Sequence, residues 1–137
     1  MTRLPFLAGL TIALLLALPS TAQAVVNGAA RNVPYVIGFH PLFSNQTPYL
    51  GQMRLNFNHG IISGTYTDLS IRPGSPFADA YNIPVSGGLS GSQITLQIRQ
   101  ITFRGTLIGE KMSGSATIRG SIYTFAAQQG TPGSGRH

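Results

Sequence analysis

The chain has 137 residues, with nine Lys and Arg against three Asp and Glu, a formal net charge of +6, and neither Cys nor Trp. A chain of this length is expected to form one domain, and the absence of Cys excludes disulfide bonds and a lipid-anchored lipoprotein. The basic balance is compatible with binding to an anionic polymer, although a charge of this size also serves to keep a protein in solution.

The first 24 residues have the features of a signal peptide for export. Arg3 gives the charged start, Phe6–Leu18 is a 13-residue uncharged and mostly apolar core, and Ala22-Gln23-Ala24 supplies the small residues that a signal peptidase accepts. A membrane-spanning helix needs about 20 apolar residues, so this core is short for one. We therefore expect cleavage after Ala24 and a secreted or periplasmic protein. The lack of Cys favours a bacterial source, because small eukaryotic secreted domains usually carry disulfides.

Cleavage would leave residues 25–137, with a net charge of +5 and no apolar run that approaches membrane-spanning length. We expect a mobile lead-in over 25–32 and a single β domain over 33–127. The Gly-, Ser- and Pro-rich segment 128–137 is typical of a disordered tail.

Within the domain, apolar and polar residues alternate with the period of two that is typical of half-buried strands. Ser92–Leu107 is either one long strand with a bulge or two strands separated by a tight turn at Arg99-Gln100, and we favour two. In chain order we expect strands over Val33–Phe39, Leu50–Asn58, the segment around Ile62–Tyr66, Asn82–Gly87, Ser92–Leu107, Met112–Ile118 and Ser121–Ala127.

Four short segments favour turns between these strands. Asn58-His59-Gly60 contains Asn and Gly, which tolerate the positive φ angles of hairpin turns. We expect further turns at Gly87–Gly91, at Gly109–Lys111 and at Arg119-Gly120.

A short pattern recurs five times: an apolar residue, a polar residue, Gly, then Ser or Thr. A Gly on the inward side of a strand leaves room where a small sheet curls tightly. We expect Gly64, Gly105 and Gly114 to have this role. The five copies are centred on Gly64, Gly91, Gly105, Gly114 and Gly120.

Seven or eight short strands in simple succession, without a convincing helix, predict a small antiparallel up-and-down β-barrel, and a two-sheet β-sandwich is the alternative. Closure into a barrel would remove exposed strand edges, which suits a secreted sheet with few charges.

In such a meander, the first and third connections leave from the same end. These are the two long loops, over 40–49 and 68–81. Ligand sites favour barrel mouths with apolar walls and a few polar groups, so we predict a ligand site at this mouth, although the aromatic residues could instead plug the barrel end. The predicted site consists of Phe43, Tyr49, Arg72, Phe77 and Tyr81.

The strands also carry Arg residues at positions that face outward, among Gln, Asn, Ser and Thr. Such a wall can bind phosphate or carboxylate polymers through charge-assisted hydrogen bonds. Nucleic acid is not expected, because Tyr35, Phe57, Tyr66 and Phe103 are predicted to face inward rather than to stack bases. The outward residues are Arg54, Arg99, Arg104 and Arg119.

We expect neither catalysis nor a cofactor. The three His residues have no metal-ligand spacing, and no Cys or carboxylate lies at a suitable interval. The acidic residues Asp68, Asp79 and Glu110 are divided between loops expected at opposite ends, whereas glycoside hydrolysis needs two carboxylates together. No nucleophile motif surrounds any Ser.

Gly64-Thr65-Tyr66-Thr67, leaving one strand for a variable loop, is similar to a short stretch of the avidin and streptavidin barrels. The resemblance implies a secreted eight-stranded meander and biotin binding. That family walls its ligand with Trp, which this chain lacks, so no binding residues are carried over.

These features predict a non-enzymatic exported β-barrel that binds a small amphipathic ligand or peptide at the mouth. One alternative is a structural or surface-associated protein of the envelope or biofilm, attached to an anionic polymer through its basic outer face. Another is an inhibitor that inserts a long loop into an exported enzyme.

Overall fold

The computed structural model describes residues 29–71 and 73–132. The predicted signal peptide and its cleavage site lie outside this part of the chain, as does Arg72. Within the described residues there are eight strands and no helix: β1 (Ala29–Pro41), β2 (Tyr49–Asn58), β3 (Ile61–Asp68), β4 (Ile83–Ser90), β5 (Gln93–Ile98), β6 (Ile101–Ile108), β7 (Lys111–Ile118) and β8 (Ser121–Gln129).

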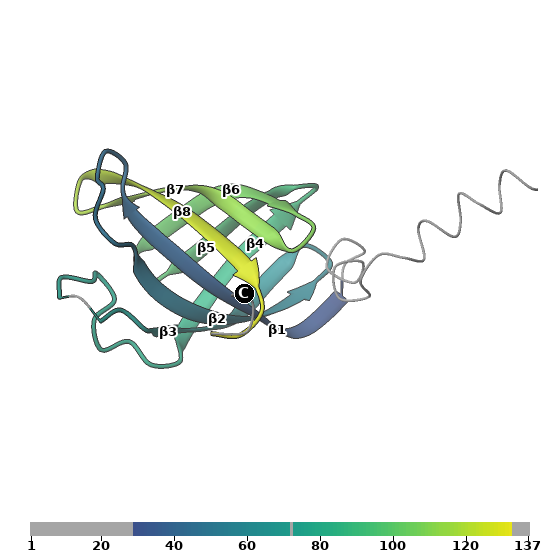
Figure 1. Cartoon of the computed structure of the whole chain (residues 1–137). Helices are drawn as coiled ribbons and strands as arrows, with labels where there is room; N and C mark the ends of the chain where they lie inside the picture. Colours follow the sequence, from purple (N-terminus) through teal and green to yellow (C-terminus); the bar gives the residue numbers. More distant parts are fainter. Residues whose placement is uncertain (1–28, 72, 133–137) are drawn as a thin grey trace, which may run out of the picture.

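The eight strands form a closed antiparallel barrel in which each strand pairs with its neighbours in sequence (Figure 1). The barrel closes where β1 pairs with β8, from Tyr35 opposite Gln129 to Pro41 opposite Tyr123. The predicted up-and-down barrel is therefore confirmed, and the sandwich alternative is wrong. An eight-stranded meander is also the fold that the resemblance to avidin and streptavidin implied.

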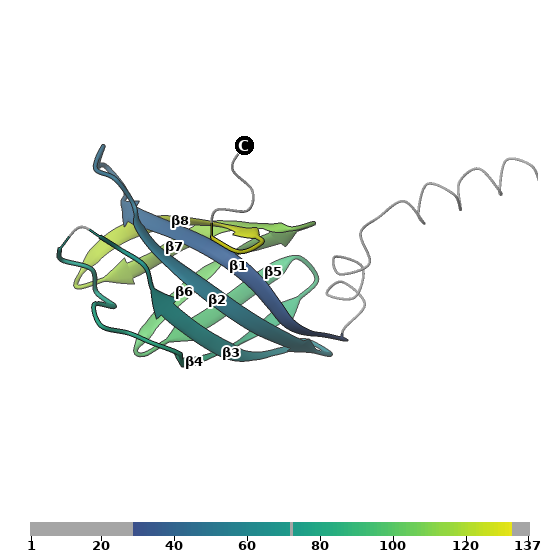
Figure 2. The ribbon, with the colours of Figure 1, turned by 60° about the horizontal axis from the view of Figure 1, so that its bottom comes forward.

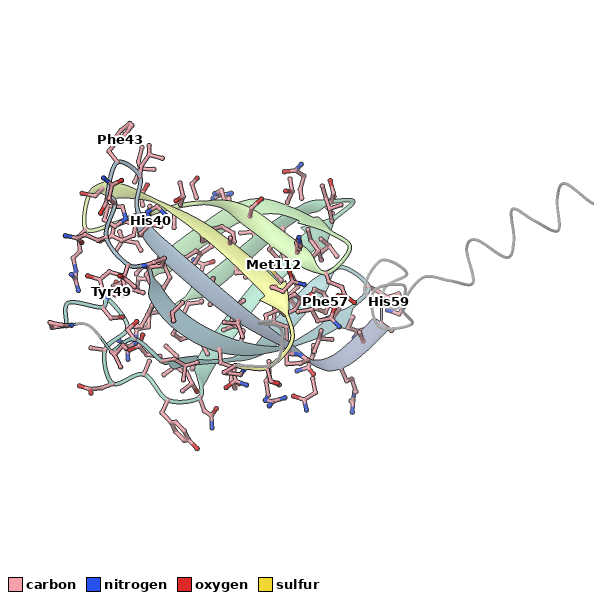
Figure 3. The ribbon with its side chains drawn as sticks, in the orientation of Figure 1. His40, Phe43, Tyr49, Phe57, His59 and Met112 are labelled. Carbon is pink, nitrogen blue, oxygen red and sulfur yellow. The ribbon has the colours of Figure 1, made fainter. Side chains whose placement is uncertain are left out.

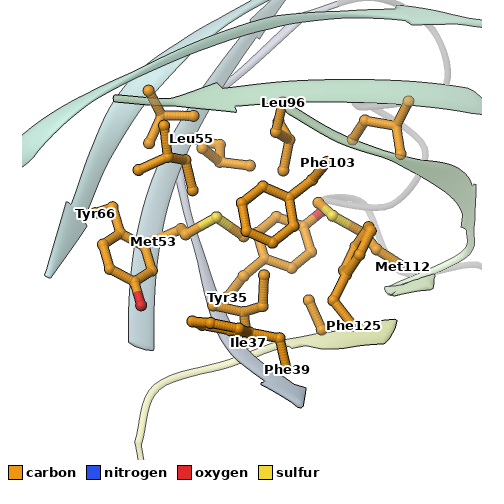
Figure 4. Packing of buried hydrophobic residues seen from close by; sticks show 14 of the residues in the cluster. Tyr35, Ile37, Phe39, Met53, Leu55, Tyr66, Leu96, Phe103, Met112 and Phe125 are labelled. Atoms are coloured by element: carbon orange, nitrogen blue, oxygen red, sulfur yellow. The ribbon is translucent and has the colours of Figure 1, made fainter. Parts of the chain in front are cut away.

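Side chains of alternate residues point into the barrel and fill it, as the period of two predicts. Tyr35, Phe57, Tyr66 and Phe103 all face inward and are buried. Aromatic rings pack beside aliphatic side chains and Met53 in one continuous core (Figure 4). Full burial of a large apolar side chain stabilises a protein by roughly 1.5–3 kcal/mol, so this core is the main source of the barrel's stability.

Inward-facing glycines allow adjacent strands of the barrel to approach closely. Gly105 of β6 and Gly114 of β7 are paired directly. A Cβ at Gly105 would overlap the carbonyl oxygen of Ser113, and one at Gly114 would overlap that of Arg104. Gly64 makes the same kind of approach to the carbonyl of Arg54. All three glycines therefore lie on the inward side of their strands, as predicted, and neighbouring strands approach closely there.

Most of the predicted turns agree with the structure, and one is wrong. Arg99 and Arg119 each have positive φ, 56° and 53°, in two-residue turns, so 92–107 forms two strands. The turn predicted at Gly87–Gly91 lies further along, because β4 continues to Ser90. Gly87 and Gly88 are strand residues paired with Leu96 and Thr95, and only Gly91 has the positive φ of a turn, 61°.

The first and last strands are longer than predicted. β1 begins at Ala29, so residues 29–32 belong to the barrel rather than to a lead-in. β8 extends to Gln129, because Gln128 and Gln129 pair with Val36 and Tyr35 of β1. These two residues therefore belong to the barrel and not to the predicted tail.

The two ends of the barrel differ in their connections. We call the loop end the one that carries the long loops 42–48 and 69–82, with the short turns 99–100 and 119–120. The opposite end carries the turns 59–60, 91–92 and 109–110, and the first residues of β1 and last residues of β8. Figures 1 and 2 show the two long loops together at one end of the barrel.

Candidate functional site

The mouth at the loop end is closed by aromatic side chains. Phe77, from the long loop 69–82, is 0% exposed and packs against Phe39, Tyr66 and Phe103, with ring centroids 5.7, 4.9 and 6.2 Å away. Tyr49 is also buried, with its ring 5.6 Å from that of Phe39. These two residues of the predicted site therefore plug the barrel.

Asp68, the last residue of β3, holds the loop that carries this plug. Its Oδ1 accepts hydrogen bonds from the hydroxyls of Ser75 (3.0 Å) and Ser70 (3.2 Å). Its backbone N–H donates to the carbonyl of Ala80, 3.0 Å away. The Ser75 oxygen in turn accepts from the N–H of Phe77. Residues 75–80 are thus folded back over the mouth, and Asp68 anchors them.

Phe43 and Tyr81, two further residues of the predicted site, are exposed and lie apart. Phe43 is 97% exposed and points away from the barrel near the tip of its loop (Figure 3). The N–H of its neighbour Leu42 donates to the carbonyl of Ile122 in β8, which draws this loop toward β8. Tyr81 lies two residues before β4, which is on the opposite side of the barrel from β8. The structure therefore does not gather the predicted residues around one open mouth.

A shallow depression lies beside Phe43 on the outer surface of the loop end. Its volume is about 400 Å³, and it is formed by the end of β1, the start of loop 42–48 and the turn into β8. The turn residue Arg119 immediately precedes this lining. The depression thus has apolar lining residues from both β1 and β8, and Arg119 adjoins this lining along the chain. It is lined by Pro41, Leu42, Phe43, Gly120, Ser121 and Ile122.

The four outward Arg residues are all exposed, but they do not share a face. Arg54 lies in the middle of β2 and Arg104 in the middle of β6, and these strands are on opposite walls of the ring. Arg99 and Arg119 occupy turns at the loop end instead. The structure therefore splits the predicted basic face into two isolated wall positions and a pair at the loop end.

The sequence predicts that Tyr35 and Tyr66 face inward, but it does not reveal that their hydroxyls are buried without partners among the described residues. Tyr35 and Tyr66 are 0% exposed, and neither hydroxyl has a hydrogen-bond partner in the part of the chain that the structure describes. Burial, with a smaller contribution from the charge of Glu110, raises the pKa of Tyr35 to about 12. Burial and secondarily Asp68 raise the pKa of Tyr66 well above its usual range. Both phenols therefore remain neutral at physiological pH.

The acidic residues do not form a paired site. Glu110 lies in a turn at the opposite end, whereas Asp68 and Asp79 are at the loop end. In residues 29–71 and 73–132, no three His, Asp or Glu side chains gather in a way that could hold a metal ion. The same residues contain no helix long and apolar enough to cross a membrane.

Comparison with known proteins gives no relative from which a function could be transferred. No family model matches the chain, and no curated protein or solved structure matches it significantly.

Proposed function

We propose that the protein is an exported, non-enzymatic binding protein that holds an amphipathic partner on the outer surface of its loop end. This differs from a ligand held inside the mouth, because Phe77 and Tyr49 occupy that space. The predicted signal peptide supports export.

The exposure of Phe43 is the observation that carries the proposal. A Phe that is 97% exposed gains little from burial in its own fold. It lies with the exposed side chains of Leu42 and Ile122, and neighbouring exposed apolar side chains of this kind mark interaction sites. It borders a depression whose rim includes the half-exposed Ile122. The backbone N–H of Leu42 also donates to the carbonyl of Ile122, which holds the start of this loop against β8.

The surroundings of Phe43 define the chemistry of the partner. An apolar moiety would pack against Phe43 and Ile122, and an anionic group would find Arg119 in the adjoining turn. Arginine binds carboxylate and phosphate groups through paired hydrogen bonds. The matching partner is therefore an amphiphile with a negatively charged head.

The test measures how much of the exported protein co-sediments with isolated cell envelopes of the native host. The double variant Phe43→Ser with Ile122→Ser should reduce the bound fraction about tenfold, since each of its two substitutions removes part of an apolar contact with the partner. The matched control is Ile61→Ser with Ile108→Ser, which removes two exposed Ile side chains from the opposite end.

Equal losses for the two double variants would overturn the proposal. Loss of binding for Arg54→Gln with Arg104→Gln, while the Phe43 variant still binds, would instead favour attachment through the basic outer wall.

A further inference from the structure

The exposed apolar side chains of the barrel are concentrated at the loop end. Nine large hydrophobic residues are exposed among residues 29–71 and 73–132. Only Ile61 and Ile108 lie at the opposite end, whereas seven lie in the long loops or within two residues of a strand end that joins the loop end. We call these seven the apolar rim: Leu42, Phe43, Leu50, Leu69, Ile71, Tyr81 and Ile122.

The apolar rim surrounds the mouth rather than forming one groove. Phe43 and Ile71 are each 97% exposed, and they belong to different long loops. Tyr81 and Ile122 stand next to β4 and in β8, which are on opposite sides of the ring. A rigid protein partner would need a separate pocket for each of these protruding side chains. A fluid lipid surface accepts all of them without such complementarity.

Two exposed Arg residues at the loop end can meet anionic headgroups of the same surface, and two carboxylates lie at this end as well. Arg99 and Arg119 are exposed in the two short turns that lie beside the long loops. Of the two carboxylates at this end, Asp68 is engaged by Ser70 and Ser75, and Asp79 is exposed. Cations beside apolar side chains bind anionic headgroups while the apolar groups enter the acyl region.

We propose that the loop end docks onto an anionic phospholipid bilayer, with Phe43 and Ile71 inserted at the interface and Arg99 and Arg119 against the headgroups. This inference rests on the proposed function and identifies its amphipathic partner as a membrane surface. The plug formed by Phe77 keeps the barrel closed on docking, so binding needs no opening of the core.

The experiment measures the partition of the exported protein onto sedimented vesicles made of equal parts phosphatidylcholine and phosphatidylglycerol. Phe43→Ser with Ile71→Ser should lower the partition coefficient roughly a hundredfold, because two large apolar side chains no longer enter the lipid. Ile61→Ser with Ile108→Ser is the matched control and should leave partition unchanged. Thermal melting should be alike for both double variants, since all four side chains are exposed.

A second variant tests the electrostatic part. Arg99→Gln with Arg119→Gln should reduce partition onto these vesicles about thirtyfold, because each Arg near an anionic surface contributes on the order of 1 kcal/mol. The same variant should leave the weaker partition onto pure phosphatidylcholine unchanged.

Three results would overturn the inference. The first is no partition onto either vesicle, and the second is an equal loss for the loop-end and opposite-end Ser variants. The third is a concentration-dependent dimer, without vesicle binding, that the Phe43 and Ile71 variant abolishes, because the apolar rim would then bind a second copy of the chain. If host envelopes still bind through Phe43 and Ile122 while pure lipid does not, the bilayer inference fails and the proposed function stands.

Discussion

The loop end and the opposite end of the barrel are closed by different parts of the chain. At the opposite end, strand residues such as Phe57, Ile62 and Met112 reach inward next to their turns and fill the barrel themselves. At the loop end, the strands leave space that Phe77 and Ala80 fill from the loop 69–82. The opposite end is thus filled by inward-facing strand residues, whereas the loop end depends on a loop that Asp68 anchors.

At the loop end, the residues that complete the core are different from the residues that are exposed to a partner. The inward side of loop 69–82 completes the core, and the outer side of the same end carries most of the exposed apolar residues. A loop that is anchored from within by Asp68 can present Ile71 on its outer side. We therefore expect stability and binding at the loop end to be separable by mutation.

The largest effect on stability should come from removing the plug. Phe77→Ala deletes a fully buried ring that contacts three other aromatic rings, and truncations of this kind lower the free energy of unfolding by about 3–5 kcal/mol. Urea unfolding measures the loss, with Phe43→Ala as the control that should change stability by less than about 0.5 kcal/mol.

The location of the damage also matters for the comparison of the two ends. Hydrogen exchange should accelerate mainly in the loop 69–82 of the Phe77 variant, and the turns of the opposite end should stay protected. Equal acceleration of exchange at both ends would contradict this difference, because loop 69–82 would then not close its end independently of the rest of the barrel.

The alternation of the strands was sufficient to predict the barrel and which side chains face inward. Met53, Leu55 and Phe57 alternate with polar residues, and the apolar set of an alternating strand is the set that faces the core. The turn at Arg99-Gln100 was harder, because a non-glycine residue takes positive φ there and no sequence signal marks it. At Gly87 and Gly88 the sequence predicts a turn where the strand continues, because glycines in a strand resemble the glycines of a turn.

The loop end was predictable only in part. Strand order alone brings both long loops to one end, but whether a loop side chain enters the barrel depends on how its segment folds back. Phe77 turns inward because Asp68 binds Ser70 and Ser75, which are contacts that no local spacing reveals. Phe43 has similar chemistry and stays outside.

The next largest loss of stability should come from a substitution in the barrel wall between the two ends. Gly114→Val places a branched side chain against the carbonyl of Arg104, and overpacking of this kind costs about 1–3 kcal/mol. Ser113→Val is the control, because Ser113 faces outward in the same strand and is exposed. Urea melts compare the two variants.

In contrast to the Phe77 variant, Gly114→Val should raise hydrogen exchange at both ends together, because β6 and β7 extend from one end to the other. A neutral Gly114→Val would contradict the close approach of these strands.

The smallest effect, at alkaline pH, concerns the buried hydroxyl of Tyr35. Its pKa of about 12 in the folded state exceeds its value of 10.0 in an unfolded chain, so above pH 10 the unfolded state loses this proton first. The free energy of unfolding is therefore unaffected by this group below pH 10 and falls as the pH rises toward 12. At pH 11 the loss due to Tyr35 is on the order of 1 kcal/mol relative to neutral pH.

Tyr35→Phe should remove this part of the alkaline destabilisation, and denaturant unfolding at pH 7 and pH 11 measures the difference. At pH 7 the variant should be as stable as the native chain or slightly more so, because the deleted hydroxyl has no hydrogen-bond partner among the described residues. Tyr66→Phe makes the same comparison for the hydroxyl whose pKa Asp68 helps to raise, and Tyr81→Phe, which alters an exposed side chain, is the control. A clear loss of stability at pH 7 for Tyr35→Phe would mean that its hydroxyl has a stabilising partner.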